Sequence, residues 1–335
     1  MAEPPVARAM LDALTLPAGL RCEQAARLLV EPAAQLVARP SKGFRARLVH
    51  VAFELARCGR AKDVGTDAAL AKAAAAIELL HAGSLIVDDI QDASPVRRGT
   101  SSLHVMIGVP RALCTGNWLY FAPLRLLREL ELPPARELEL YRRYHDAIEQ
   151  AHCGQALDLG LKVRDVSRLE VPALSRRIAA LKSGAIVSLA MVVGAVVGGA
   201  SESETEALAR FGASFGLVLQ TLDDAGNAYG RTEPAKRYED LMAWRLSGPW
   251  AFAAADAVRY ETLLEAVEEL PDDGALQRWL AATEFFDHAS ASARTELDHA
   301  LATLESELEA AGRHPATGTV DALREIIEGL IRAYR

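Results

Sequence analysis

Apolar residues recur along this chain with the spacing of helices. Three long segments have apolar positions close to 3.6 residues apart: Ala68–Val87, Ala135–Leu159 and Gly274–Ala310. We find no sustained alternation of apolar and polar residues of the kind that marks strands joined by hairpin turns. The pattern predicts an all-α fold, a single-domain helical bundle over residues 1–335, with residues 1–18 as a loosely held N-terminal arm.

One helical segment, residues 183–201, carries no charge and is rich in Val, Ala and Gly. Its length is about that of a membrane span, but Leu, Ile and Phe are sparse in it and no aromatic belt flanks it. A helix that is apolar on all sides is also what the centre of a bundle requires. We therefore predict a buried central helix and no stable membrane insertion.

Composition narrows the possible functions. The net charge of −8 argues against nucleic-acid binding, which needs a basic surface. Four widely spaced cysteines fit neither a zinc site nor a disulfide framework, so reduced thiols are expected. The first residues lack a charged segment followed by an apolar one, as in a signal sequence, and we expect a cytoplasmic protein.

Two aspartate clusters follow apolar segments that are far apart in the chain. Asp88, Asp89 and Asp92 form the first, and Asp223 and Asp224 form the second, in which Asn227 takes the third position. Residues four apart on a helix project from one face, about 6 Å from each other. One such cluster is more often a solvated helix end. Two of them favour a shared ligand, divalent metal with a phosphate or diphosphate, since carboxylates are costly to bury alone and Mg²⁺ prefers oxygen ligands.

Basic residues near these clusters have two interpretations each. Lys42 and Arg45 precede an apolar helical segment, where cations oppose the helix dipole unless an anion binds there. The pair Arg97-Arg98 could form surface ion pairs or clamp a diphosphate through bidentate hydrogen bonds. His81, alone in an apolar segment, could be a core residue or a ligand.

Taken in order, these motifs resemble the trans-isoprenyl diphosphate synthase family, also called polyprenyl synthetases, from about Pro40 to Pro249. The two aspartate clusters, the second with Gln220 before it, match the two aspartate-rich motifs of that family. Further matches are Ser41–Arg45, His81, Arg97-Arg98, Gly154-Gln155 with Asp158, Lys182-Ser183-Gly184, and Lys236 with Asp240 and Arg245.

The resemblance implies an isoprenoid synthase fold, a bundle around a deep central cavity, usually as a homodimer. It implies that Asp88, Asp92 and Asp223 hold Mg²⁺, about three ions, with Asp89, Asp224 and Asn227 acting through them or through water. Arg97, Lys182 and Lys236 would complete the grip on an allylic diphosphate, with Arg245 in the basic loop beside them. Lys42, Arg45, His81 and Arg98 would bind isopentenyl diphosphate, while Ser183 and Gln220 would line the reacting centre. The catalytic set would be Asp88, Asp92, Asp223, Lys182 and Gln220.

Four positions depart from the family pattern: Ser41, Asn117, Asn227 and Arg245. A terpene cyclase on the same scaffold is one alternative, and the neutral Asn227 favours it mildly. The retained residues of the isopentenyl diphosphate site argue against it. A non-catalytic helical subunit is the other alternative, and the largely intact motifs argue against that.

Product length is predicted from residues below Asp88. Gly83 and Ser84 are small, whereas aromatic residues there stop growth near C15 in the resembled family. Leu80 and Ile77 lie deeper, and Trp118, Tyr120 and Phe121 could close the cavity at that depth. We expect a product of about C20 or longer, geranylgeranyl diphosphate above all.

Overall fold

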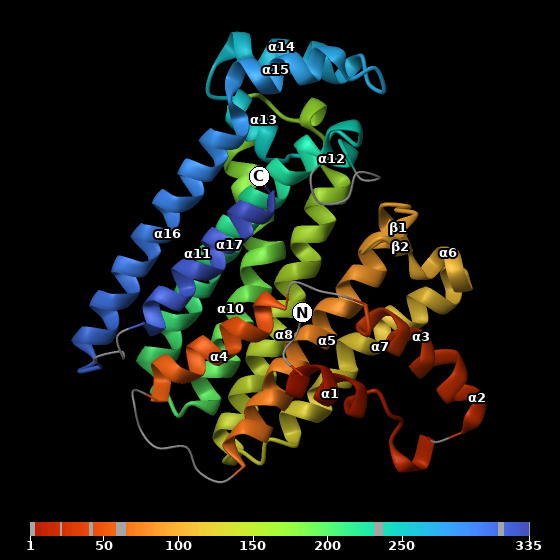
Figure 1. Cartoon of the computed structure of the whole chain (residues 1–335), viewed down its shortest axis with the longest axis vertical. Helices are drawn as coiled ribbons and strands as arrows, with labels where there is room; N and C mark the ends of the chain where they lie inside the picture. Colours follow the sequence, from red (N-terminus) through yellow and green to blue (C-terminus); the bar gives the residue numbers. More distant parts are fainter. Residues whose placement is uncertain are drawn as a thin grey trace. The chain divides into compact units, whose positions relative to one another are not determined.

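The computed structural model describes residues 4–20, 22–39, 43–57, 65–230, 237–313 and 318–334. Within these ranges the chain is helical apart from one short hairpin, so the all-α prediction is confirmed (Figure 1). The chain divides into two compact units. Unit 1 comprises residues 1–145, 189–209 and 308–320, and unit 2 comprises residues 146–188, 210–307 and 321–335. That residues 1–335 act as a single domain stays a prediction.

The elements up to residue 128 belong to unit 1. They are α1 (Pro4–Ala13), a 3₁₀ turn (Ala18–Leu20), α2 (Glu23–Ala25), a π-helical turn (Ala26–Val30), α3 (Glu31–Val37), α4 (Phe44–Arg57), α5 (Thr66–Gln91), β1 (Val96–Arg97), β2 (Thr100–Ser101), α6 (Leu103–Ile107) and α7 (Val109–Arg128).

The later elements belong to unit 2 or cross between the units. They are α8 (Pro134–Gly160), a 3₁₀ turn (Val163–Asp165), α9 (Val171–Ala179), a π-helical turn (Ala180–Gly184), α10 (Ala185–Val197), α11 (Glu202–Tyr229), α12 (Glu239–Met242), α13 (Gly248–Ala253), α14 (Ala257–Glu268), α15 (Gly274–Thr283), α16 (Phe285–Ala310) and α17 (Thr319–Tyr334).

The core of unit 1 is built on α5 and α7, which run alongside each other (Figure 1) and pack along an extensive contact. Ala73–Ala76 and Ile77 of α5 are fully buried. Alanine is the best helix former and has the smallest apolar side chain, so this stretch both stabilises α5 and lets its neighbours approach. The helix predicted over Ala68–Val87 is confirmed.

The N-terminal segment differs from its prediction. Its described part forms α1, which packs on α5, and Val6, Met10 and Leu14 are at most 6% exposed. These positions are one turn apart and define one apolar face of a helix. The periodicity was present in the sequence, and the expectation of a loosely held arm is wrong for this helix.

The core of unit 2 uses the few aromatic residues of the chain. The Trp250 ring is fully buried and lies 5.6 Å, centroid to centroid, from the rings of both Trp244 and Tyr260. The segment Gly274–Ala310, expected to be helical throughout, is broken at Glu284, whose φ of 48° is left-handed. An L-residue with that φ cannot continue a right-handed helix, so the chain turns from α15 into α16 there.

Two helical stretches are long and apolar enough to cross a membrane, Thr66–Gln91 and Val171–Val197, the second including most of the uncharged segment noted above. Inside the protein, 72% and 67% of their most apolar windows are buried. Their hydropathy is therefore accounted for by core packing, as predicted for the uncharged segment.

Candidate active site

The first aspartate cluster stands at the end of α5. The helix ends at Gln91, and the N–H of Asp92, its C-cap, donates to the carbonyl of Asp88 at 2.9 Å. Asp88 and Asp92 are half-buried, whereas Asp89 is only 2% exposed. The one-turn spacing thus keeps the first and third carboxylates on one side of the helix and turns the second inward.

The hairpin that follows supplies a cation to this cluster. Arg98 and Gly99 form its turn with φ of 55° and 74°, the left-handed pair that tight two-residue hairpins require. The Arg97 guanidinium donates through Nε to Asp89 Oδ1 at 2.9 Å and through Nη2 to Asp88 Oδ2 at 3.3 Å. Asp89 therefore has its charge compensated within the chain, as a buried carboxylate must.

Positive charge gathers around His81 in the same unit. Burial, followed by the charges of Arg45, Arg98 and Arg97, holds the pKa of His81 well below 6.5. Its imidazole is consequently neutral at neutral pH. The structure brings together three residues predicted to bind isopentenyl diphosphate, namely Arg45, His81 and Arg98. The fourth, Lys42, lies outside the described residues.

Glu78 helps to position the start of α4, and the sequence motifs did not reveal this role. Its Oε1 accepts a hydrogen bond from the Ala46 N–H at 3.0 Å, and it is 5% exposed. The carboxylate satisfies one of the amides left without helical partners at the start of α4, next to Arg45. Glu78 thus ties the start of α4, which carries Arg45, to α5. A lone acidic residue in the apolar stretch of α5 was the available signal.

The second aspartate cluster lies in the last two turns of α11, in unit 2. Asp223 is exposed and Asn227 is half-buried one turn later. Asp224 is 8% exposed and accepts hydrogen bonds from Gln220 Nε2 at 2.7 Å and from the Gly248 N–H at 2.6 Å. Burial, then the charge of Asp240, raises the pKa of Asp224 to about 8. Asp223 and Asn227 thus lie toward the surface, while Asp224 is held inward.

Lys182 and Ser183 occupy the π-helical turn between α9 and α10. A Cβ at Gly154 of α8 would lie 2.7 Å from Leu181 Cβ and 2.8 Å from Lys182 N. Only glycine allows this approach, so the Gly-Gln-x-x-Asp segment has a packing role next to the turn. Isolated π turns inside helices often occur at functional sites, and the sequence pattern did not predict this one.

Hydrogen bonds join the predicted residues of unit 2. Lys182 Nζ pairs with Asp158 Oδ2, and Arg245 Nη1 lies 3.4 Å from the same oxygen. Ser183 Oγ donates to Gln220 Oε1 at 2.6 Å, and Gln220 in turn donates to Asp224. The predicted side chains of unit 2 are therefore held in place by one another. Lys236 lies outside the described residues.

Gly83 does not border open space in the structure. A Cβ on it would lie 2.8 Å from Leu119 Cβ and 3.0 Å from the Gly116 carbonyl oxygen. Five residues rotate a helix position by about 500°, roughly 140° from Asp88, so Gly83 faces α7. Leu80 and Ile77 are also fully buried. Ser84 is half-buried one turn before Asp88, and its Oγ donates to the His81 carbonyl at 2.8 Å.

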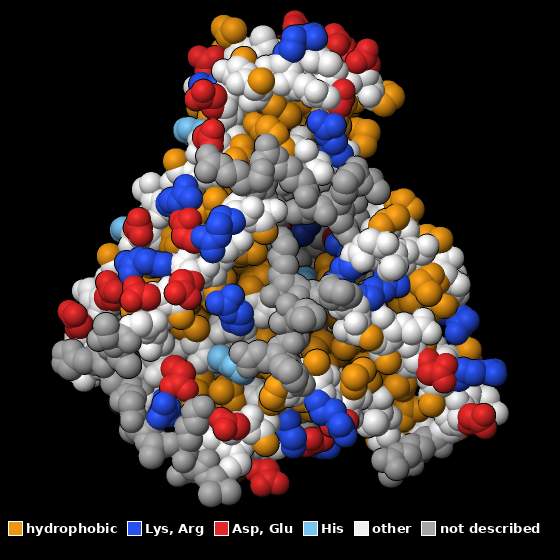
Figure 2. All heavy atoms as spheres, viewed as in Figure 1, with side chains coloured by type: hydrophobic (Ala, Val, Ile, Leu, Met, Phe, Trp, Pro, Cys, Tyr) orange, Lys and Arg blue, Asp and Glu red, His pale blue; other side chains and the backbone are white. Residues whose placement is uncertain are grey.

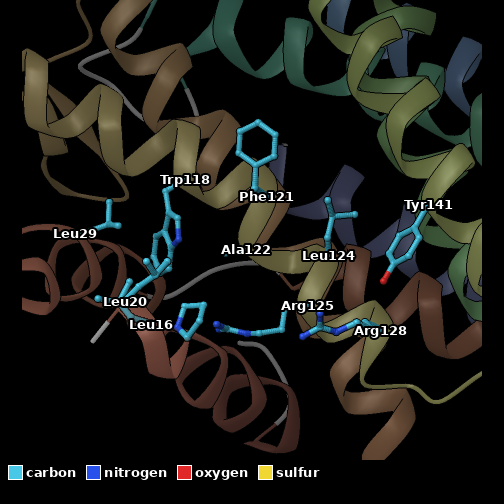
Figure 3. Close-up of a pocket in the computed structure, with 11 residues that line it drawn as sticks. Leu16, Leu20, Leu29, Trp118, Phe121, Ala122, Leu124, Arg125, Arg128 and Tyr141 are labelled. Atoms are coloured by element: carbon cyan, nitrogen blue, oxygen red, sulfur yellow. The ribbon is translucent and has the colours of Figure 1, made fainter. Parts of the chain in front are cut away.

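Two of the three aromatic residues expected to close the cavity share one pocket. Trp118 and Phe121 both line a pocket of about 420 Å³ beside the N-terminal segment (Figure 3), where Trp118 points toward Leu20 and Phe121 is 68% exposed. Tyr120 is not among the residues that line this pocket. Burial, then the charge of Asp88, raises the pKa of Tyr120 to about 12. The structure therefore does not gather all three into one cavity floor.

The donor sets fit magnesium. Asp88 with Asp92, and Asp223 with Asn227, each place two oxygen-bearing side chains one helical turn apart, half-buried or exposed. Oxygen donors with room for water and phosphate oxygens are what Mg²⁺ takes in proteins. The two clusters belong to different units, and their action on one ligand stays a prediction.

The fold and these motifs define an all-α protein with two aspartate-rich helices of the isoprenoid synthase type. The sequence pattern of the family described as polyprenyl synthetase matches residues 26–282. The chain belongs to this family.

Individual relatives agree. A geranylgeranyl pyrophosphate synthase 2 from Zymoseptoria tritici is 28% identical over 311 residues, 91% of this chain and 87% of that protein. A geranylgeranyl diphosphate synthase from Sulfolobus acidocaldarius is 32% identical over 155 residues; the match covers 45% of this chain and 46%, or about half, of that protein. A crystal structure of a geranylgeranyl pyrophosphate synthase has a TM-score of 0.78 at 19% identity, covering 98% of this chain and 96% of that one. The last similarity concerns the fold.

Proposed function

We propose that this protein is a trans-prenyltransferase that condenses isopentenyl diphosphate with an allylic diphosphate. The observation that carries the proposal is the arrangement in unit 1, where Arg45 and Arg98 surround His81 on the same helix that carries Asp88 two turns later. A cationic group beside a metal-binding carboxylate pair suits two diphosphates, one bound by cations alone and one through metal. A cyclase acting on one diphosphate would not need the cationic group.

The aspartates divide into two kinds. Asp89 is paired with Arg97, and the pKa of Asp224 is raised to about 8, so both carry little uncompensated charge at neutral pH. The ligands we propose are Asp88, Asp92 and Asp223, and Asp88 also meets the Arg97 guanidinium at 3.3 Å. An allylic diphosphate adds about three negative charges. About three Mg²⁺ ions would balance that total. Bound there, Mg²⁺ would stabilise the charge of the departing diphosphate as the allylic C–O bond ionises.

The remaining steps fall to the protein and the substrates. Arg45, Arg98 and the neutral His81 hold isopentenyl diphosphate so that its double bond meets the allylic cation. Ser183 and Gln220, fixed by their mutual hydrogen bond, line the reacting centre without offering a strong base. The departing diphosphate takes the last proton. The apolar surroundings must exclude water, which would quench the cation to an alcohol.

A homodimer in the cytoplasm is part of the proposal. Apolar side chains reach the surface over α6 and the start of α7 (Figure 2), where Val105, Met106, Val109 and Leu113 are 39–55% exposed. Exposed apolar patches of this kind mark interaction surfaces. We propose that this patch binds a second copy of the chain.

For the product we propose about C20, geranylgeranyl diphosphate. The support is twofold: several relatives carry that name, and Ser84, on the Asp88 side of α5, is small.

Metal dependence tests the proposal. Turnover should vanish in chelator and return with Mg²⁺, and Asp88→Ala or Asp223→Ala should lower it by orders of magnitude. Asp298→Ala is the matched control, because Asp298 lies on α16 with 69% of its side chain exposed. Undiminished turnover in either motif variant would reject the metal-clamp mechanism.

A further inference from the structure

Arg39 lies two residues beyond the end of α3, and its side chain contacts the hairpin formed by β1 and β2. Its Nη1 donates to the Arg97 carbonyl at 3.2 Å, and its Nη2 lies 3.3 Å from Met106 Sδ. The side chain is half-buried. None of the motifs described above includes this residue.

The contact runs in both directions. Arg98 Nη1 lies 3.5 Å from the Arg39 carbonyl oxygen, at the outer limit of a hydrogen bond. The Arg39 side chain is thus tied to the hairpin backbone, and the Arg98 side chain is directed at the Arg39 backbone. The end of the α3 segment and the hairpin turn therefore fix each other.

The hairpin needs such support. Each of its strands has two residues, joined by the left-handed Arg98 and Gly99. A two-stranded hairpin is marginal in water on its own. The contacts described above that hold it are the Arg97 bonds to Asp88 and Asp89 and the Arg39 bonds, and Thr100 Oγ1 adds a bond to the Arg97 carbonyl at 3.3 Å. The Arg39 contacts reach the hairpin from the segment after α3, about sixty residues earlier in the chain.

Electrostatics agree with this placement. Burial lowers the pKa of Arg39, while the negative charge of Asp89 raises it. Arg39 therefore interacts electrostatically with Asp89. Its hydrogen bonds, however, go to a backbone carbonyl and a thioether. Its geometry is that of a brace.

We propose that Arg39 is a positioning residue for the diphosphate site: it braces the hairpin so that Arg98 stays beside His81 and Arg45. It acts through Arg98 and does not touch substrate. The inference rests on the proposed function, because it assigns Arg98 to isopentenyl diphosphate.

The test compares Arg39→Ala, Arg39→Gln and Arg39→Lys with Arg142→Ala, an exposed arginine of the same unit on α8. Isopentenyl diphosphate is titrated calorimetrically into each protein without metal, and steady-state rates are measured with each substrate varied. Arg39→Ala should weaken isopentenyl diphosphate binding and raise its KM about tenfold, with the allylic KM and kcat within about threefold of wild type. Gln and Lys, which can each still donate one hydrogen bond to the Arg97 carbonyl, should both recover part of the loss. Arg142→Ala should match wild type.

Three outcomes would overturn the brace. One is unchanged binding of isopentenyl diphosphate by Arg39→Ala. Another is equal loss for both substrates, which would indicate general disruption of the site. The third is recovery by Lys but not by Gln, which would mean that the charge of Arg39 contacts the substrate. The calorimetric arm needs no turnover, so a wild type without condensation activity would reject the proposed function and still leave the brace measurable.

Discussion

The close contact between α5 and α7 can be tested by adding one methyl group at Gly83. In Gly83→Ala the new Cβ would lie 2.8 Å from Leu119 Cβ, 3.0 Å from the Gly116 carbonyl oxygen and 3.3 Å from the Leu119 carbonyl carbon. All three neighbours are backbone atoms or a Cβ, so no flexible side chain can move aside. The helices must separate by several tenths of an ångström along the extensive contact between α5 and α7.

The expected cost follows from two opposing terms. Overpacking in a well-filled core costs about 1–3 kcal/mol, and the rigid neighbours place this site at the upper end. Replacing glycine by alanine within a helix returns up to about 1 kcal/mol. The free energy of unfolding should therefore fall by about 2 kcal/mol. In a protein of this size each kcal/mol lowers the melting temperature by roughly 2 °C, so we expect a fall of about 4 °C.

Thermal unfolding followed by circular dichroism measures this shift, with Gly160→Ala as the matched exchange. Gly160 ends α8, is exposed and has no neighbour within 4 Å of the added Cβ. The Gly160→Ala variant should be slightly more stable than the wild type. If Gly83→Ala were as stable as Gly160→Ala, the described approach of α7 to α5 would be wrong. The same contact means that Gly83→Phe would damage the fold before it reported on product length.

Three further outcomes follow from the site. Ser84→Phe should shift the main product toward C15 while the first condensation stays active, and mass spectrometry of the products measures this shift. Ser84→Ala should leave the product length unchanged. An unchanged product length in Ser84→Phe would contradict growth of the chain beside Asp88. Glu78→Ala leaves the buried Ala46 N–H without its acceptor and should cost about 1–3 kcal/mol in urea unfolding, whereas Glu78→Gln should retain most of the stability; equal losses would rule out this cap. Since the pKa of His81 is lowered in the folded protein, stability contributed by its neutral ring is present above about pH 6.5, the unfolded value, and is lost as the pH falls below it. His81→Gln should show a smaller loss of stability between pH 7 and 5 than wild type, and an identical pH profile would refute the lowered pKa.

Helices with strong periodicity were predictable, and their ends less so. The helices α5 and α8 begin and end within four residues of the predicted segments. The prediction was close because alanine and leucine propensity and apolar spacing agree there. The break at Glu284 was not predictable, because the apolar pattern continues through it. The π turn before Ala185 was not predictable either, because an extra residue in one turn leaves no distinct mark in the helical pattern of the sequence.

Side-chain partners were harder to predict than helix faces. That Asp88 and Asp92 share a side of α5 follows from their spacing. The pairing of Arg97 with Asp89, and of Lys182 with Asp158, depends on loops and on neighbouring helices. Gly83 illustrates the limit of one sequence: a small residue is equally consistent with an open cavity and with a close helix contact, and the position of α7 decided between them.

The central claim is that the protein joins two diphosphates. The most direct measurement incubates it with farnesyl diphosphate and Mg²⁺, with and without isopentenyl diphosphate, and identifies products by mass spectrometry. We predict geranylgeranyl diphosphate as the main product, formed only when isopentenyl diphosphate is present. A hydrocarbon or alcohol formed equally well without isopentenyl diphosphate, or no product under either condition, would contradict the account.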